Sequence, residues 1–217
     1  MNYCLLFDSD GTLVDSEAIN QQAMADELAV LHIIEDPQVL LNRYRGWQIT
    51  AVLEDLGARH GLNFDHAFEQ RFRARASAYF DSDLQPIPNI ETALLKLQDE
   101  KCVASNAPMT KLRQVLAKTD LAKFFNDRLF SAYDIKAFKP DPQLFLHAAG
   151  AMGFEPCQCI VIEDSQVGVQ AALSAGMQCV CYCPHEKPPT LSDSVLMVRD
   201  MLELPDAIEM LKNRRLS

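Results

Sequence analysis

Two aspartates two positions apart are the first residues of this chain whose spacing could serve chemistry. Asp8 and Asp10 follow the apolar run at residues 3–7, and Gly11 permits the tight turn that keeps both carboxylates near the end of that run. Two carboxylates this close disfavour each other's ionisation, so one stays protonated or a cation lies between them. That division suits a nucleophile paired with a general acid, whereas the alternative is an acidic turn that caps the next helix.

Further polar residues stand at the ends of later segments of the chain. Each of the following also has an ordinary structural interpretation, as a helix cap, a solvated side chain or an acidic turn. They are Ser105 and Asn106 after one apolar run, Lys139 at the start of the segment KPDP, and Glu163 and Asp164 after another apolar run.

The elements that must position these residues are short apolar runs separated by helical patterns. Residues 3–7, 102–104, 159–162 and 179–182 are continuous apolar runs that end in polar or turn residues, as buried strands do. Segments between them, such as residues 144–152, repeat apolar residues at three- and four-residue spacing. This βαβα order predicts an α/β fold, a Rossmann-like parallel sheet with helices on both faces, whose ligands bind beyond the carboxyl ends of the strands.

A helical segment interrupts this pattern after the first run. Residues 16–83 contain no β-branched run, and their apolar residues recur at helical spacing up to a return point just before Pro86 and Pro88. We therefore expect an α/β core of residues 1–15 and 84–217 and a helical cap at residues 16–83.

The string FDSDGTLVDSE at residues 7–17 resembles the first motif of the haloacid dehalogenase superfamily, specifically its magnesium-dependent phosphatases and phosphomutases. Ser105 with Asn106 is similar to the second motif and the KPDP segment at Lys139 to the third. Residues 163–165, with Gly168 following, resemble the acidic fourth motif, so the resemblance spans essentially the whole chain.

The resemblance implies roles for these residues. Asp8 would be the nucleophile that forms an aspartyl-phosphate, and Asp10 the general acid and base. Ser105, Asn106 and Lys139 would bind the phosphoryl group, with Ser105 and Lys139 also serving catalysis. The Asp8 carboxylate, the Asp10 carbonyl and Asp164 would hold Mg²⁺, with Glu163 in support. A count of charges agrees, because three ionised carboxylates and a phosphate outweigh one lysine unless a divalent cation with hard oxygen ligands joins them.

The helical cap would close over the strand ends and recognise the leaving group of the substrate. By resemblance to the relatives of β-phosphoglucomutase, residues 45–47 match the position of a substrate-specificity loop. Arg45 could pair there with an anionic group at the far end of a sugar phosphate, and its alternative is an exposed loop arginine. Other arginines of this segment are interpreted as a solvated face: Arg43, Arg71, Arg73 and Arg75.

The chain resembles the β-phosphoglucomutases over most of its length, but two positions depart from their pattern. Asn20 stands where many mutases carry histidine, and Ile49 stands where they place an arginine for a second phosphate. Hydrolysis is therefore favoured over a β-phosphoglucomutase-type reaction, and the intact acidic set disfavours a non-catalytic binding protein. The segment LFSAYDI at residues 129–135, followed by KPDP, is most similar to bacterial 6-phosphogluconate phosphatases. The predicted substrates are sugar phosphates or phosphorylated sugar acids, 6-phosphogluconate among them.

Composition limits the partners. The chain has 217 residues, 48% of them hydrophobic, with 20 Lys and Arg against 30 Asp and Glu and a net charge of −10. This excess of acid disfavours nucleic acids and anionic membrane surfaces, which leaves a small phosphate monoester as the expected partner. No apolar run is long enough to span a bilayer and no basic segment precedes the first one, so we expect a cytoplasmic protein, a monomer or a weak homo-oligomer.

The seven cysteines are an odd number and lie mostly in apolar segments, which suits reduced thiols better than a disulfide framework. A zinc cluster of Cys157, Cys159, Cys179, Cys181, Cys183 and His185 is disfavoured, because alternate residues of a strand share a face whereas structural zinc takes ligand pairs from turns.

Overall fold

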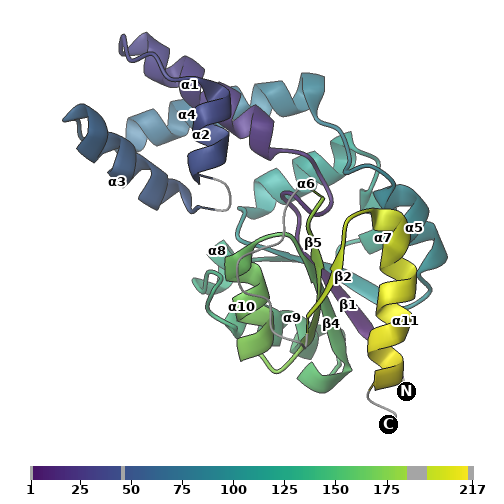
Figure 1. Ribbon diagram of the computed structural model, residues 1–217. Coiled ribbons are helices and arrows are strands. Elements are labelled where there is room, and N and C mark those ends of the chain that lie inside the picture. The colour runs from purple at the N-terminus through teal and green to yellow at the C-terminus, as the bar shows by residue number, and fades with distance from the viewer. Residues whose placement is uncertain (1, 45–46, 185–194, 215–217) are drawn as a thin grey trace. The chain divides into compact units, whose positions relative to one another are not determined.

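A six-stranded, all-parallel sheet forms the centre of the protein (Figure 1). The computed structural model describes residues 2–44, 47–184 and 195–214. The strands are β1 (Cys4–Phe7), β2 (Glu100–Ser105), β3 (Leu129–Ser131), β4 (Cys159–Glu163), β5 (Gln178–Tyr182) and β6 (Val195–Val198). Their order in the sheet is β3-β2-β1-β4-β5-β6.

Helices cover both faces of the sheet (Figure 1). In chain order they are α5 (Ile90–Lys96), α6 (Met109–Lys118), α7 (Ala122–Phe125), α8 (Ala132–Ile135), α9 (Gln143–Met152), α10 (Gln166–Ser174) and α11 (Leu204–Arg214), with short 3₁₀ turns at Pro156–Gln158 and Met201–Glu203. The apolar sides of α9 and α10 pack on the face that carries Cys4 and Leu6. On the other face, the rings of Phe7 and Phe125 meet at 5.6 Å between centroids. This arrangement confirms the predicted α/β fold with a parallel sheet.

The buried cysteines belong to one of these two core layers. Cys4, Cys102, Cys159, Cys179 and Cys181 all lie in the layer under α9 and α10. Burial raises the pKa of the Cys179 and Cys181 thiols, which keeps them protonated and unreactive. The interpretation of these residues as core thiols agrees with their positions. His185 lies outside the described residues.

A helical unit is inserted between β1 and α5, as predicted. The backbone divides into one compact unit of residues 1–14 and 85–217 and another of residues 15–84. The second unit consists of α1 (Glu17–Val30), α2 (Pro37–Tyr44), α3 (Ile49–His60) and α4 (His66–Asp83). Asn20 lies in α1, and Ile49 is the first residue of α3.

The arginines of the helical unit are more than a solvated face. Arg71 and Arg75 on α4 are partly exposed, yet both form ion pairs with Glu27 on α1, at 3.4 and 2.8 Å. Glu27 is itself only 4% exposed. Arg43 pairs with Asp55, and Arg73 pairs with Glu69 one helical turn away. Arg43 therefore ties α2 to α3, and Arg71 and Arg75 tie α4 to α1 and satisfy a buried carboxylate.

Two strands escape sequence prediction, and both lie at the edges of the sheet. β3 contributes three residues and β6 four, and β6 is only partly buried along its length. The apolar part of β3 is too short to mark a strand, whereas β6 is an apolar run of the same length as β1 and could have been recognised from the sequence.

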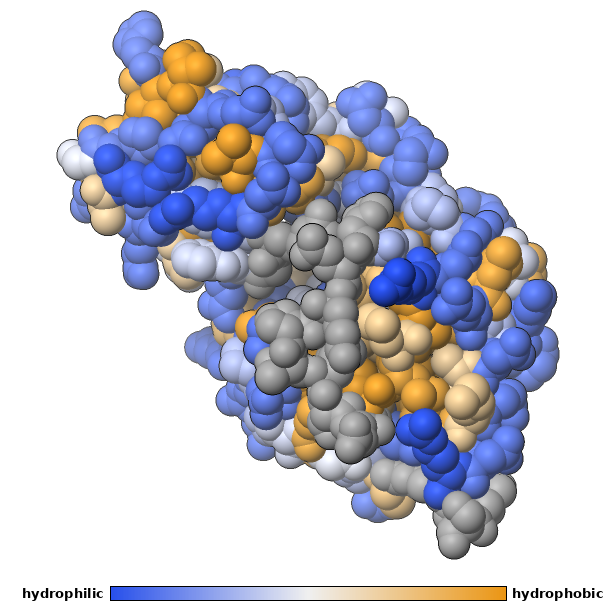
Figure 2. Space-filling model, in the orientation of Figure 1, coloured by the Kyte–Doolittle hydropathy of each residue, from blue (hydrophilic) through white to orange (hydrophobic). Residues whose placement is uncertain are grey.

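Hydrophilic residues predominate on the face of the molecule shown in Figure 2, and apolar side chains occur among them in separate groups. Among the described helices, none combines the length and the apolar character that crossing a membrane requires.

Candidate active site

The loop after β1 presents the two predicted catalytic aspartates. Asp8 follows the last residue of β1, and its backbone N–H donates to the carbonyl of Ile162 on β4 at 2.9 Å. The Ser9 carbonyl then accepts hydrogen bonds from the N–H groups of the next turn, which reverses the chain. Gly11 has a φ of 82° in this turn, a conformation that favours glycine. The turn therefore keeps Asp10 beside the strand end.

Lys139 occupies the centre of the acidic group. Its side chain is 2% exposed, and its Nζ lies 2.6 Å from Asp8 Oδ1 and 2.7 Å from Glu163 Oε1. The Nζ also lies 4.8 Å from the centre of the Phe145 ring. The alternative interpretation of Lys139 as a solvated side chain is thus wrong.

Asn106 binds the backbone of Lys139 through both ends of its side-chain amide. Its Oδ1 accepts from the Lys139 N–H at 2.9 Å, and its Nδ2 donates to the Lys139 carbonyl at 3.4 Å. Asn106 follows β2, so these two bonds tie the end of β2 to the loop that carries the lysine. The sequence suggests a substrate contact for Asn106, and the structure shows it holding Lys139 in place.

Ser105 is the last residue of β2 and is buried. Its Oγ accepts from the Ala107 N–H at 3.1 Å, and the Ala107 carbonyl in turn accepts from the Ser131 hydroxyl at 2.7 Å. The N-cap of the next helix is Pro108, so the alternative role of Ser105 as a helix cap is wrong. Two serines thus hold the backbone of this loop.

The two oxygens of Glu163 have different partners. Oε1 accepts from Lys139, whereas Oε2 accepts from the Asp164 N–H, the Ser165 N–H and the Ser165 hydroxyl at 2.8–3.0 Å. A Cβ added to Gly168 would lie 1.8 Å from Oε1, so only glycine fits there. Gly168 also donates its N–H to Ser165 Oγ, the N-cap of α10. Both oxygens of Glu163 therefore accept hydrogen bonds that orient Lys139 and the start of α10.

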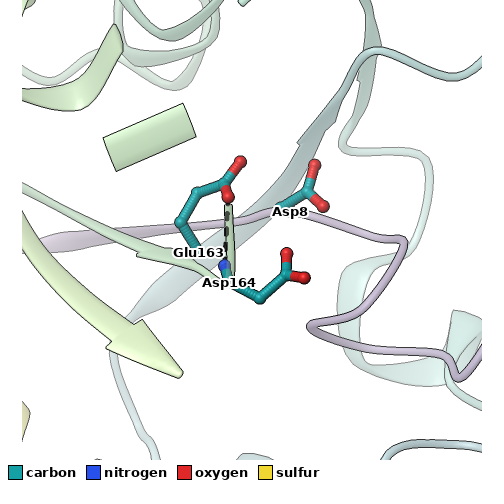
Figure 3. A group of neighbouring side chains, drawn as sticks. All are labelled: Asp8, Glu163 and Asp164. Atoms are coloured by element: carbon teal, nitrogen blue, oxygen red, sulfur yellow. Dashed lines mark hydrogen bonds between the residues drawn. The ribbon is translucent and has the colours of Figure 1, made fainter. Parts of the chain in front are cut away.

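Asp164 lies against the loop after β1. Its Oδ1 accepts from the Thr12 hydroxyl at 3.3 Å, and a Cβ on Gly11 would lie 2.1 Å from its Oδ2. Figure 3 shows Asp164 and Glu163 at the end of β4 beside Asp8 from the end of β1. One oxygen from each of these three carboxylates lies within 4.8 Å of the others. This group of hard oxygen donors fits a divalent cation.

Burial and charge act against each other at Asp8. Burial raises the pKa of the Asp8 carboxyl to about 7, because the attraction of Lys139 only partly offsets the cost of desolvation and the neighbouring Glu163 raises the pKa further. Burial by itself would lower the pKa of Lys139, but Asp8 and Glu163 outweigh it and raise that pKa. Lys139 therefore remains charged.

Sequence reasoning missed one ionic contact in this site. Lys111 Nζ lies 2.8 Å from Oδ1 and 2.9 Å from Oδ2 of Asp10. Lys111 is in the first turn of α6, six positions after Ser105. Its place near the start of the helix that follows β2 is the signal that could have indicated it. Arg45, the predicted reader of the substrate, lies outside the described residues.

The chain is similar to known proteins in sequence and in fold. Residues 4–176 match the model of the haloacid dehalogenase-like hydrolases. The chain is 36% identical over 187 residues to 6-phosphogluconate phosphatase of Escherichia coli K12, covering 85% of each chain. It is 30% identical over 179 residues to fructose-1-phosphate phosphatase of the same organism, covering 81% of this chain and 94% of that one.

Solved structures agree. A haloacid dehalogenase-like protein of Agrobacterium tumefaciens C58 superposes with a TM-score of 0.82 at 25% identity, covering 98% of this chain and all of the other. The sheet order, the helical insert and the family match over most of the length lead to one conclusion. This chain belongs to the haloacid dehalogenase-like hydrolases.

Proposed function

We propose that this protein is a Mg²⁺-dependent phosphatase that hydrolyses small phosphorylated carbohydrates through an aspartyl-phosphate on Asp8. The observation that carries this proposal is the buried Lys139, held by Asp8 and Glu163 next to Asp164. A buried cation among carboxylates at a strand end suits the binding of a phosphoryl group and the stabilisation of its charge during transfer. The activities of the two Escherichia coli relatives support the same substrate class.

In the first step, an Asp8 carboxylate oxygen attacks phosphorus and the bond to the leaving oxygen breaks. Asp10 gives its proton to that oxygen, so the product leaves as an alcohol. Lys139 contacts Asp8 at 2.6 Å, which restrains the nucleophile and places a positive charge beside the incoming phosphate. Ser105 and the backbone of the loop after β2 would complete the phosphate site.

In the second step, water attacks the phosphorus of the aspartyl-phosphate. Asp10, now a carboxylate, takes a proton from that water, and the bond from phosphorus to the Asp8 oxygen breaks. Inorganic phosphate leaves and Asp8 is restored as a carboxylate, so the protons and charges of the cycle balance. The same side chain serves as acid and then as base, which requires it to stay aimed at one place.

The residues present fit a magnesium ion. The Asp8 and Asp164 carboxylates and the Asp10 backbone carbonyl would hold it, and all are hard oxygen donors. Glu163 would act in support, because its two oxygens already accept hydrogen bonds from Lys139, Asp164 and Ser165. When bound, Mg²⁺ would neutralise negative charge on the phosphate.

Within the substrate class, phosphorylated sugar acids such as 6-phosphogluconate are the preferred candidates. The 36% identity to a phosphatase of that compound supports this choice. We infer that the helical unit acts as a cap that selects the leaving group, with Arg45 as the residue that pairs with its distal anion. Both roles rest on the family resemblance.

The experiment measures phosphate release from 6-phosphogluconate, fructose 1-phosphate and p-nitrophenyl phosphate with Mg²⁺. Asp8→Asn should reduce kcat to below about 1% of the unaltered enzyme, because an amide cannot form the acyl phosphate. Asp127→Asn, the same change at an exposed aspartate on a loop outside the site, is the matched control. Hydrolysis by Asp8→Asn at an undiminished rate, with deamidation excluded, would contradict the proposal.

A second assay separates hydrolysis from mutase activity. With β-glucose 1-phosphate and a bisphosphate primer, we expect inorganic phosphate and no glucose 6-phosphate, because Ile49 offers no charge for a second phosphate. Rapid isomerisation with little phosphate release would instead identify a mutase.

A further inference from the structure

The contact between Lys111 and Asp10 has no part in the proposed chemistry so far. Lys111 extends from the first turn of α6, and Asp10 lies in the loop after β1, 101 positions earlier in the chain. The side chains are 20% and 27% exposed, so the ion pair is largely sheltered from water. Both residues belong to the α/β unit, which makes their contact independent of the placement of the helical unit.

We propose that Lys111 is a positioning residue that aims the Asp10 carboxylate at the reacting oxygens. This inference rests on the proposed function and deepens it. The Nζ lies within 2.9 Å of both Asp10 oxygens, so the contact restrains the plane of the carboxylate as well as its distance. A single hydrogen bond to one oxygen would leave that plane free to turn.

The aim of Asp10 matters in both steps. The proton of Asp10 passes to the leaving oxygen in the first step, and a proton of water passes to Asp10 in the second. Lys111 keeps its own protons throughout and exchanges none. Because proton transfer needs the donor and acceptor within hydrogen-bond reach, a carboxylate that swings away from the site loses rate in each step.

Two other roles for Lys111 make different predictions. A lysine that only stabilised the fold would affect all substrates equally. A lysine that contacted the leaving group directly would matter even when Asp10 could no longer transfer a proton. A lysine that acts through Asp10 matters most for leaving groups that need protonation, and it loses its effect when Asp10 is replaced.

The experiment compares kcat/KM, which reports the first step, for an alkyl ester and an aryl ester. The leaving group of fructose 1-phosphate is a basic alkoxide, which needs a proton as it departs. The leaving group of p-nitrophenyl phosphate is the stable p-nitrophenolate anion, which needs little protonation. The variants are Lys111→Met, Lys111→Arg, Asp10→Asn and the double variant Asp10→Asn with Lys111→Met. Lys118→Met, which removes an exposed lysine from the last turn of the same helix, is the matched control.

We expect Lys111→Met to lower kcat/KM for fructose 1-phosphate by about 10- to 100-fold and to lower it about tenfold less for p-nitrophenyl phosphate. Lys111→Arg should recover most of the loss, because it keeps a cation beside Asp10. In the Asp10→Asn background, Lys111→Met should cause no further loss on the alkyl ester. Thermal unfolding of each variant checks that it folds.

Equal losses on the two esters, an undiminished loss in the Asp10→Asn background, or an equal effect of Lys118→Met would each overturn the inference. So would full activity of Lys111→Met on both esters. If the unaltered protein releases phosphate from neither ester, the proposed function itself fails, and the inference fails with it.

Discussion

At the scale of single residues, the site is governed by how each buried carboxylate is satisfied. Asp8 shares Lys139 with Glu163, and the second oxygen of Glu163 is occupied by three hydrogen bonds from Asp164 and Ser165. Asp8 keeps one strong partner in a buried place, which is why its pKa rises whereas Glu163 serves as a fixed anchor. A carboxyl with a perturbed pKa, such as that of Asp8, is typical of functional sites and is consistent with the proposed role of Asp8 as nucleophile.

The raised pKa of Asp8 predicts a pH dependence of stability in metal-free protein. The pKa rises from its ordinary value of 3.8 to about 7, so the folded protein holds this proton more tightly than the unfolded chain does. Its contribution to the free energy of unfolding therefore falls as pH rises between these two values. Asp8→Asn does not titrate and should become more stable relative to the unaltered protein across that range, by an upper limit of about 4 kcal/mol.

Urea unfolding in EDTA at several pH values from 4 to 8 measures this difference. A stability difference between the two proteins that stays constant with pH would show that Asp8 titrates at its ordinary value in the fold.

Gly168 predicts a second effect at this scale. Gly168→Ala places a Cβ 1.8 Å from Glu163 Oε1, so the carboxylate or the start of α10 must move and Lys139 loses its anchor. We expect a loss of about 2–4 kcal/mol in unfolding free energy, the range for overpacking together with a broken buried ion pair. Phosphate release should fall as well.

Gly150→Ala is the matched control for this substitution. Gly150 lies in α9 with nothing within 4 Å of its added Cβ, so alanine should leave stability unchanged or raise it by up to about 1 kcal/mol. Equal unfolding curves for the two variants would contradict the tight fit at Gly168.

At the scale of elements, the site is assembled where neighbouring parallel strands end. β1 contributes Asp8, β4 contributes Glu163 and Asp164, and the end of β2 holds the Lys139 loop through Asn106. β1 pairs with both β2 and β4, so the three ends lie at one edge of the sheet. Acidic residues stand at the ends of β1 and β4, so the parallel sheet brings their like charges together at this edge, where Lys139 supplies one positive charge.

Because these like charges lie close together, we predict that binding of a metal ion raises the free energy of unfolding. Mg²⁺ added to EDTA-treated protein should raise the unfolding free energy by about 2.7 kcal/mol at a concentration one hundred times its Kd. Asp164→Asn should lose this gain, and Asp134→Asn at an exposed position of α8 should keep it. EDTA should also abolish phosphate release, and Ca²⁺, with its larger and looser coordination, should restore little of it.

Thermal unfolding with and without each ion gives the binding readout independently of activity. Full activity in metal-free buffer, or an equal Mg²⁺ stabilisation of Asp164→Asn, would contradict the assignment of these ligands.

At the scale of the whole molecule, the chain forms two units with separate means of stabilisation. The α/β unit has its apolar layers on the two faces of the sheet and buries the charges of Lys139 and Glu163, and the helical unit buries a charge of its own. Glu27 on α1 is 4% exposed and is satisfied by Arg71 and Arg75 of α4. Removing the charge of Glu27 leaves Arg71 and Arg75 without their anion. The resulting loss of stability is confined to the helical unit.

Glu27→Gln should therefore weaken the helical unit selectively. We expect a loss of about 1–3 kcal/mol, since two partly exposed arginines lose charge-assisted hydrogen bonds. Hydrogen exchange should rise in α1 and α4 and stay unchanged in β1, β2 and β4. Glu69→Gln, which removes an ion pair within α4, is the matched control and should cost no more than about 0.5 kcal/mol. Faster exchange throughout the sheet would show that the two units unfold together.

The residues of the candidate site could be predicted from the sequence alone. Asp8, Asp10, Lys139 and Asp164 follow local patterns, since each stands in a short motif at or near the end of a predicted segment. The central strands and the helical insert were predictable for the same reason, because apolar periodicity is a property of neighbouring residues. The edge strand β3 was not, because its two apolar residues are too few to show such a pattern, whereas the apolar run of β6 is as long as that of β1 and could have been recognised.

Only the tertiary structure decided which partner each of these residues has. The Lys139 contact with Asp8 joins residues 131 positions apart, and that of Thr12 with Asp164 joins residues 152 positions apart. The use of Asn106 to hold Lys139 and the pairing of Lys111 with Asp10 likewise cross between elements. Such contacts depend on the order of strands in the sheet and on the directions of side chains at their ends. Neither is encoded in the spacing of residues along the chain, because pairing of strands is a property of the folded whole.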